Sequence, residues 1–245
     1  MTILILGATS AIAQAYARRR ASGASFVLVG RREDRLAAIA ADLIASGANS
    51  AETVVVDLAE LDGIAQHARS LRARNPNLDQ IVIAYGMLGD QAASERDIQA
   101  ARVVIENNFV SAALWILALL RDHPPSAPLT LVAIGSVAGD RGRASNFIYG
   151  AAKAGLDRVL EGLAQKYDGT PVRIVTVKPG FVDTPMTAGI AGKRGLLWAT
   201  ADKVAADIER AAAKGARVVY TPWFWWPIMF IIRHLPWFVF RRLKI

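Results

Sequence analysis

The 245-residue sequence contains no cysteine, which excludes a disulfide framework, a thiolate metal site and a cysteine nucleophile. The absence also suits a reducing compartment, so a cytoplasmic location is expected. The histidines His67, His123 and His234 are scattered without the spacing of metal ligands, and we predict no metal site and no catalytic triad.

Charged residues are also few, at 20% of the chain against 53% hydrophobic residues, which excludes a disordered protein. Met1 is followed almost directly by the apolar residues 3–6, without a basic region or a cleavage signal, so no secretory peptide is expected. The length fits one large domain, and no linker rich in proline, glycine or serine divides it.

Acidic residues are missing from the C-terminal end. Glu209 is the last of them, and it is followed by seven basic residues: Arg210, Lys214, Arg217, Arg233, Arg241, Arg242 and Lys244. Of the net charge of +8, residues 1–209 therefore carry only +1, from 22 basic and 21 acidic residues. A nucleic-acid-binding protein usually has a basic stripe over its folded body, so nucleic acid is not expected as a partner.

Short apolar runs alternate with longer segments whose apolar residues have helical spacing. The runs predict strands at residues 2–6, 25–29, 53–56, 80–84, 129–134, 172–177 and 217–220. They are continuous, as in parallel strands covered on both faces. The segments between them predict helices at residues 11–21, 33–46, 61–73, 97–121, 147–167 and 201–214. The pattern predicts an α/β fold with a doubly wound, mostly parallel, seven-stranded sheet covered by helices on both faces.

A turn of small residues follows the first predicted strand. Residues 7–13 read Gly-Ala-Thr-Ser-Ala-Ile-Ala and lead into a helix. In this fold class a dinucleotide pyrophosphate binds the free N–H groups at such a helix start, and small residues let the backbone approach it. We therefore predict cofactor contacts from Gly7, Thr9, Ser10, Ala11 and Ile12, with an ordinary strand-to-helix turn as the alternative.

The end of the second predicted strand carries Arg31 and Arg32, where an NAD site would carry an acidic residue. A guanidinium can pair with a 2′-phosphate through two hydrogen bonds, which favours NADP(H) over NAD(H). The alternative is a pair of solvated arginines at a helix start. Asp57 and Leu58 follow the third strand and are assigned to the adenine end, although an aspartate that only begins a helix fits as well.

Tyr149 and Lys153 are the predicted catalytic pair. They lie four residues apart in an apolar helix and therefore share one of its faces. A nearby cation lowers the pKa of a tyrosine from its usual value of about 10 toward the operating range. Ser136 follows the strand at 129–134, where open α/β sheets place their ligands, and its hydroxyl is positioned to hold a carbonyl against the tyrosine. A surface pair of tyrosine and lysine is the alternative.

In combination these motifs resemble the short-chain dehydrogenase/reductase family. The resemblance rests on the turn at Gly7, on Ser136, Tyr149 and Lys153, and on residues 178–184, and it covers residues 1 to about 220. It implies an NAD(P)-dependent enzyme in which Tyr149 protonates the substrate oxygen and Lys153 also binds the nicotinamide ribose.

The same resemblance assigns further residues. It implies a proton relay through Asn108, with the adjacent Asn107 as the competing choice. It implies contacts with the nicotinamide end from Pro179, Gly180, Val182 and Thr184. Residues 84–86, Ala84, Tyr85 and Gly86, stand where the family has Asn-Asn-Ala-Gly, so Tyr85 is expected to crowd the cofactor edge.

Five segments resemble one subfamily, the reductases of a 2-keto pentose carried on decaprenyl phosphate: residues 84–91, 136–147, 179–182, 186–189 and 233–236. This resemblance implies a polyprenyl-phosphate substrate, a role in cell wall biosynthesis and a flavin-dependent oxidase partner that makes the ketone. Two alternatives remain open. One is a soluble reductase of another carbonyl substrate, and the other is a non-catalytic NADP(H)-binding scaffold for a partner oxidase.

The last residues form an aromatic and basic tail. Residues 222–245 contain four of the six tryptophans, and their apolar stretch at 223–232 is far shorter than the roughly 20 residues that span a bilayer. Tryptophan prefers the headgroup level, and basic residues are attracted to anionic lipid. We therefore expect a reductase domain at residues 1–221 and a tail that contacts the inner face of the cell membrane. Packing of the tail within a homo-oligomer is the alternative.

Overall fold

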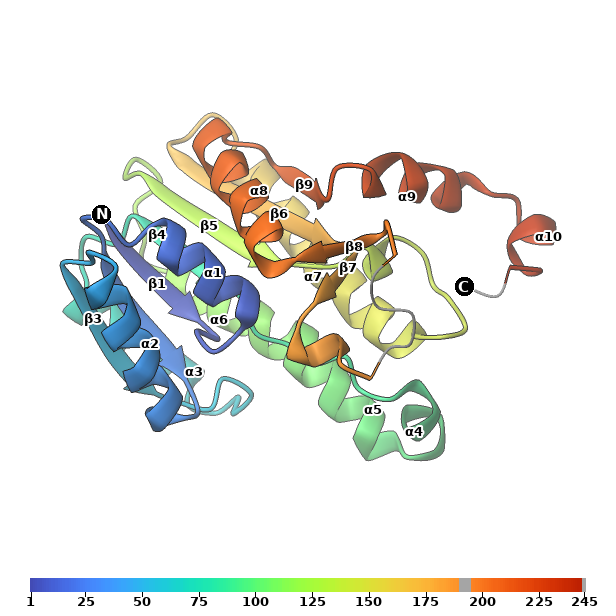
Figure 1. Cartoon of the computed structure of the whole chain (residues 1–245), viewed down its shortest axis with the longest axis horizontal. Helices are drawn as coiled ribbons and strands as arrows, with labels where there is room; N and C mark the ends of the chain where they lie inside the picture. The colour runs from blue at the N-terminus through green and yellow to red at the C-terminus, as the bar shows by residue number, and fades with distance from the viewer. Residues whose placement is uncertain (190–194, 244–245) are drawn as a thin grey trace.

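The computed structural model describes residues 1–189 and 195–243. Its main sheet has seven parallel strands in the order β3-β2-β1-β4-β5-β6-β9 (Figure 1). The strands are β1 (Thr2–Leu6), β2 (Ser25–Gly30), β3 (Ser50–Val55), β4 (Gln80–Ile83), β5 (Leu129–Ile134), β6 (Val172–Pro179) and β9 (Val218–Thr221). The predicted doubly wound, seven-stranded α/β fold is confirmed.

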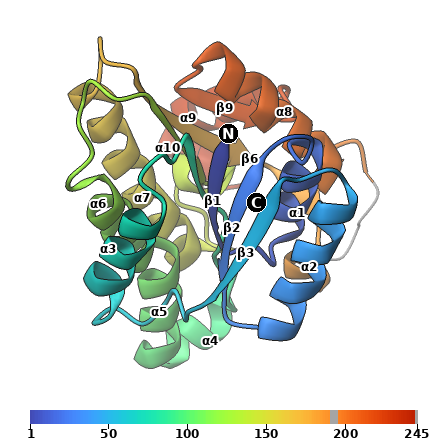
Figure 2. The ribbon, with the colours of Figure 1, turned by 90° about the vertical axis from the view of Figure 1, so that its left-hand side faces the viewer.

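Helices cover both faces of this sheet (Figure 2). One layer consists of α1 (Ala11–Arg19), α2 (Glu33–Ala45) and α8 (Ala201–Lys214), and the other of α3 (Ile64–Arg74), α6 (Ser111–Leu120) and α7 (Phe147–Lys166). Along β1, Ile3 and Ile5 enter the first core whereas Leu4 and Leu6 enter the second. This two-sided burial explains why the strand sequences are continuously apolar.

The strand order reverses beside β1, whose neighbours are β2 and β4. The chain therefore leaves β1 and β4 toward opposite faces, and a crevice opens at the carboxyl ends of these strands. Open α/β sheets bind their ligands at such a switch point. Every site residue predicted in loops after strands is brought to this edge by the parallel arrangement.

The predicted helix at 97–121 is observed as a continuous helical stretch with an irregular turn. It consists of α5 (Ile98–Ile105), a π-helical turn (Glu106–Val110) and α6. This stretch, Ile98–Leu120, is the one described helix that is long and apolar enough to cross a membrane, and half of it is buried inside the protein. Trp115 is fully buried and donates its indole N–H to Leu58 O at 3.1 Å, so the stretch is a core helix.

Several short elements were not predicted. They are α4 (Gln91–Arg96), the two-stranded sheet of β7 (Phe181–Asp183) and β8 (Trp198–Thr200), and 3-10 turns at Val137–Asp140 and Pro185–Thr187. Each is too short to show a period of hydrophobic residues. The starts of two predicted elements move by three residues: β3 begins at Ser50 instead of residue 53, and α3 begins at Ile64 instead of residue 61, because residues 61–63 form a turn. Other bounds differ by at most two residues.

The C-terminal segment forms α9 (Trp225–His234) and α10 (Trp237–Phe240), which extend to one side of the sheet (Figure 1). Trp225 and Met229 are buried against Val137, in a small cluster of their own. The outer face of the segment is apolar and exposed, with Trp223, Trp226, Phe230, Ile231, Trp237 and Phe238. Lys244 and Ile245, the end of the predicted tail, lie outside the described residues.

Candidate active site

A cavity of about 920 Å³ lies over the carboxyl ends of the strands. Its wall brings together nearly all the predicted site residues: Gly7, Thr9, Ser10, Ala11, Ile12, Arg31, Asp57, Leu58, Ala84, Tyr85, Gly86, Ser136, Tyr149, Lys153, Pro179, Gly180, Val182 and Thr184. Among the predicted residues, Arg32 and Asn108 do not line it. Residues from six loops thus converge on one space, which is large enough for a cofactor and a substrate.

The turn after β1 is shaped for close contact with a ligand backbone or phosphate. Gly7 has φ +86°, and a Cβ at this position would lie 2.6 Å from the Cβ of Tyr85. Ser10 precedes α1, but its side chain makes no capping hydrogen bond, and no acidic residue occupies the first helical turn. The first N–H groups of α1 are therefore free of a side-chain acceptor or an opposing charge, which suits a pyrophosphate.

The two arginines after β2 have different surroundings. Arg31 lines the cavity, and its guanidinium lies 3.8 Å from the Asp57 carboxylate. Arg32 instead pairs with Asp34, with nitrogen–oxygen distances of 3.2 and 2.7 Å. Asp57 also accepts the N–H of Ala59 at 3.0 Å, so it orders its own turn in addition to lining the cavity. Of the pair, only Arg31 lines the cavity.

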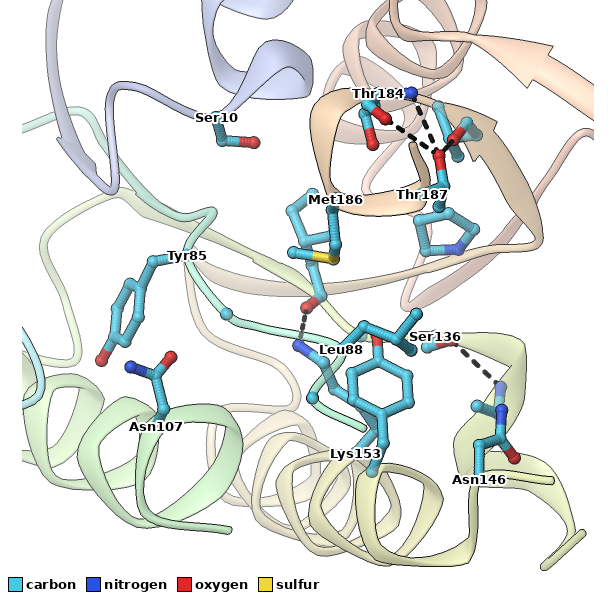
Figure 3. A pocket seen from close by; sticks show the side chains of 18 of the residues that line it. Ser10, Tyr85, Leu88, Asn107, Ser136, Asn146, Lys153, Thr184, Met186 and Thr187 are labelled. Atoms are coloured by element: carbon cyan, nitrogen blue, oxygen red, sulfur yellow. Dashed lines mark hydrogen bonds between the residues drawn. The ribbon is translucent and has the colours of Figure 1, made fainter. Parts of the chain in front are cut away.

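Tyr149 and Lys153 project from the first turns of α7 toward Ser136. The Lys153 ammonium lies 5.9 Å from the centre of the Tyr149 ring and donates to Ile134 O at 3.0 Å. Ser136 begins the 3-10 turn after β5, and its hydroxyl accepts the N–H of Ala138 at 3.1 Å. Figure 3 shows Lys153 between Ser136 and Asn146 on one side and Tyr85 and Asn107 on the other. The predicted trio therefore shares one end of the cavity.

The expected fall in the Tyr149 pKa is wrong for this structure. Burial raises the pKa of Tyr149, and a hydrogen bond with Ser136 and the charge of Arg143 offset this only in part. Burial also lowers the pKa of Lys153 to about 8, against the attraction of Asp157. Lys153 is buried and Tyr149 is partly buried, and desolvation is the largest influence on both pKa values. The phenol stays protonated at neutral pH, and this is the form that donates a proton.

A buried charge network, which the sequence did not reveal, lies beneath this trio. Lys178 forms ion pairs with Asp140 at 2.6 Å and with Asp157 at 2.8 Å, and Tyr220 donates to the other Asp140 oxygen at 2.8 Å. Burial raises the pKa of Asp157, which also interacts electrostatically with Lys153. Asp157 lies one helical turn after Lys153, and this spacing was the available signal.

The neighbouring asparagines of the π-helical turn, Asn107 and Asn108, have different surroundings. Asn108 is buried and binds the loop after β4: its side-chain amide donates to Met87 O at 2.8 Å and accepts the Met87 N–H at 3.1 Å. A Cβ on Gly86 would lie 2.6 Å from Asn108 Oδ1 and 3.4 Å from Lys153 Nζ. Asn107 lines the cavity instead. Asn108 therefore holds the loop beside Lys153, while Asn107 faces the open space.

The Tyr85 ring does not occupy the middle of the cavity. Its hydroxyl shares a hydrogen bond of 2.8 Å with Ser111, whose hydroxyl donates to Leu58 O. Burial raises the pKa of Tyr85 despite this partner. Figure 3 shows the ring directed away from Lys153, so Tyr85 forms one side of the cavity at the β4 loop.

Another wall of the cavity is formed by the loop after β6 and by the C-terminal segment. Trp225, Ile228 and Ile232 of α9 line it. The Trp225 ring packs on Gly180 and stands edge-on to Phe181, with centroids 5.6 Å apart. Beside them, Thr187 donates to Val182 O at 2.6 Å and orders the turn that follows Thr184 (Figure 3). Trp225 was not among the predicted site residues.

Comparisons with known proteins agree with this architecture. The profile of a family described as short chain dehydrogenase matches residues 1–195. An uncharacterized oxidoreductase of Mycobacterium tuberculosis is 39% identical over 241 residues, covering 98% of this chain and 96% of that protein. One of Streptomyces coelicolor is 37% identical over 251 residues, covering 100% of this chain and 96% of that protein.

Solved structures share the fold. A short-chain dehydrogenase from Sphingobium yanoikuyae in complex with NADPH has a TM-score of 0.82 at 23% identity, covering 96% of each chain. One from Shigella flexneri, complexed with NADP, has a TM-score of 0.79 at 24% identity, covering 89% of this chain and 95% of that chain.

Proposed function

This chain belongs to the short-chain dehydrogenase/reductase family of NAD(P)-dependent oxidoreductases, and on that premise we propose that it uses NADPH to reduce a ketone on a polyprenyl phosphate. The ketone is a 2-keto pentose, and the product is the secondary alcohol. The observation that carries the reductase assignment is the placement of Ser136, Tyr149 and Lys153 on one wall of a cavity that also reaches the turn at Gly7.

The residues at the turn after β1 and at Arg31 would hold the cofactor. Free N–H groups at the start of α1 fit its pyrophosphate, and the exposed Arg31 guanidinium fits the 2′-phosphate that distinguishes NADP(H) from NAD(H). NADPH, when bound, supplies the hydride for the carbonyl carbon. The Lys153 ammonium would hold the nicotinamide ribose; Lys153 and Tyr149 both line the cavity.

The side chains of this site supply orientation and the proton. The Ser136 hydroxyl donates to the carbonyl oxygen and holds it beside the phenol. Tyr149 is protonated at neutral pH, because burial raises its pKa, and it gives its proton to the oxygen as the carbonyl is reduced. The resulting phenolate is stabilised by Lys153, 5.9 Å from the ring centre, and is reprotonated through the water-accessible cavity on the side of Asn107.

The substrate class is supported by the apolar part of the cavity wall. Met186, Leu197, Ile228 and Ile232 line the cavity there. The other face of α9 carries exposed aromatic residues, among them Trp226 and Phe230. We propose that this face rests on an anionic membrane surface and that the lipid chain of the substrate follows α9 from the bilayer to the cavity.

The proposal is tested by NADPH oxidation with a membrane lipid extract in which the sugar 2-position has been oxidised. The wild-type protein is expected to oxidise NADPH with this extract, and the Tyr149→Phe variant is expected to lose at least about a thousandfold in rate because the proton donor is missing. NADPH binding, followed by fluorescence, serves as the control and should be unchanged in the variant. Full activity of the variant would refute the assigned acid.

Two other outcomes separate the remaining alternatives. Turnover of simple water-soluble ketones at the same rate as the lipid extract would assign the protein to a soluble carbonyl substrate. No turnover with any ketone, together with intact NADPH binding and capture of a flavin-dependent oxidase, would make it a scaffold.

A further inference from the structure

The loop between β5 and α7 is joined firmly to the C-terminal segment. Arg141 Nη1 donates to Leu235 O at 2.8 Å and to Ile232 O, and the Arg141 guanidinium lies 3.8 Å from the centre of the Phe240 ring. Arg143, Ser145 and Asn146 of this loop line the cavity together with Ile228 and Ile232 of α9. The loop and the helix thus form a single wall next to Ser136 and Tyr149.

Arg143 brings an uncompensated charge into this wall. It is partly buried and lines the cavity, and its Nε is buried without a hydrogen-bond partner. Within residues 1–189 and 195–243, no carboxylate forms an ion pair with it. The nearby Asp140 is already bound to Lys178 and Tyr220. Burial lowers the pKa of Arg143, and the attraction of Asp140 and Tyr149 offsets this only in part.

A second polar group of the same wall also lacks a partner. Asn146 lines the cavity, and its Oδ1 is buried with no donor among the residues that the structure describes. Asn146 precedes α7, yet its side chain makes no capping hydrogen bond. Buried polar groups are nearly always hydrogen-bonded. Two residues that line one cavity therefore each hold a buried polar atom without a partner, which a polar ligand bound beside them would explain.

The position of Arg143 fits the chemistry of the proposed substrate. In a 2-keto pentose carried on a phosphate, the phosphate is attached to the carbon next to the ketone. A cation that binds this phosphate must therefore lie close to the proton donor. Arg143 is close enough to Tyr149 for its charge to affect the phenol, and both residues line the same cavity.

We propose that Arg143 is the phosphate-binding residue of the substrate site and that it selects a phosphate ester of a long apolar alcohol over the uncharged alcohol. This inference rests on the proposed function, because it deepens the same substrate site. The guanidinium supplies a charge and hydrogen bonds to the phosphate oxygens, while α9 provides the apolar surface for the chain.

Binding of farnesyl phosphate and of farnesol to the protein saturated with NADP⁺ tests the proposal without turnover. Saturation with NADP⁺ occupies the Arg31 end, so only the substrate end is measured. By calorimetry, wild type is expected to bind farnesyl phosphate at least about tenfold more tightly than farnesol. Arg143→Gln should abolish this preference without weakening farnesol binding, and Arg143→Lys should keep most of it. Arg217→Gln, which removes an exposed arginine before β9, is the matched control and should behave as wild type.

Three results would overturn the inference. A preference for farnesyl phosphate that persists in Arg143→Gln would show that another group binds the phosphate. Equal loss of farnesol binding would show that Arg143 only supports the wall. Inorganic phosphate that binds as tightly as farnesyl phosphate would identify a site for a free anion instead of a lipid.

Unchanged affinity for NADP⁺ in Arg143→Gln shows that the variant is folded. Ketone turnover is measured separately. If wild type prefers farnesyl phosphate to farnesol but reduces no ketone, the phosphate-binding role of Arg143 stands and the proposed function is refuted. If wild type reduces the lipid ketone but Arg143→Gln binds both probes as wild type does, the proposed function stands and the phosphate-binding role of Arg143 is refuted.

Discussion

Gly180 and Trp225 are in such close contact that a Cβ on Gly180 would overlap the Trp225 indole ring. Trp225 is buried, and its indole N–H has no partner among the described residues. The contact joins the loop after β6, at the proposed nicotinamide end, to the first turn of α9. It is how the C-terminal segment becomes part of the wall of the active site.

Gly180→Ala is expected to lower the free energy of unfolding by about 1 to 3 kcal/mol, because the added methyl group must displace a buried ring. Urea unfolding measures the change. In a Trp225→Ala background the same substitution should cost little, which a double-mutant cycle tests. Gly162→Ala is the control: Gly162 is exposed in α7 with no atom within 4 Å of its Cβ position, so alanine there should stabilise by about 0.5 to 1 kcal/mol. Equal changes in the free energy of unfolding for Gly180→Ala and Gly162→Ala would show that the contact between Gly180 and Trp225 does not limit the space at Gly180.

Because of Lys153, the free energy of unfolding should change with pH in the alkaline range. Burial lowers its pKa from 10.5 to about 8, so between these values the unfolded chain binds a proton that the folded protein does not. Stability therefore rises with pH in this window, by up to about 3 kcal/mol. Lys153→Met should lack this rise, which urea unfolding of both proteins between pH 7 and about 11 measures. Parallel curves for the two proteins would show that the Lys153 pKa is not depressed.

Arg31 and Arg32 should differ in their effect on cofactor choice. Arg31→Ala is expected to raise the KM for NADPH by roughly ten- to a hundredfold and leave the KM for NADH nearly unchanged, because only NADPH carries the 2′-phosphate. Arg32→Ala should have a much smaller effect, since this guanidinium is paired with Asp34 outside the cavity. Steady-state kinetics with both cofactors compares the variants. Similar losses with NADH and NADPH would assign Arg31 to general binding.

The exposed aromatic face of the C-terminal segment should determine membrane binding. Replacing Trp226, Trp237 and Phe238 by serine is expected to weaken binding to vesicles of phosphatidylcholine with phosphatidylglycerol by more than about tenfold, since all three are largely exposed. Co-sedimentation with vesicles measures this, and circular dichroism confirms the fold. Trp198→Phe, a change in β8 outside this exposed face, is the control. Unchanged vesicle binding together with a smaller oligomer in the triple variant would identify the face as a subunit interface.

Much of the fold was predictable because its signals are local. The apolar runs of the seven strands and the helical spacing between them are properties of short segments, and the parallel arrangement then brings the loops at Gly7, Ser136 and Pro179 to one edge. The short strands β7 and β8 were missed because three residues show no periodicity. The relative places of Arg31 and Arg32 were also not predictable, because they depend on which carboxylate each guanidinium meets.

The sequence by itself determined the doubly wound sheet and the residue types of its catalytic helix, because hydrophobic periodicity and helical spacing are properties of short stretches of the sequence. Only the tertiary structure decided how strongly these groups are desolvated. It buried Lys153 and part of Tyr149, so that burial raised the pKa of the tyrosine and lowered that of the lysine, against the expectation from their spacing. It also placed Asp157 with Lys178 beneath the site and folded Trp225 onto Gly180. These contacts join residues far apart in the chain, and only packing in three dimensions creates them.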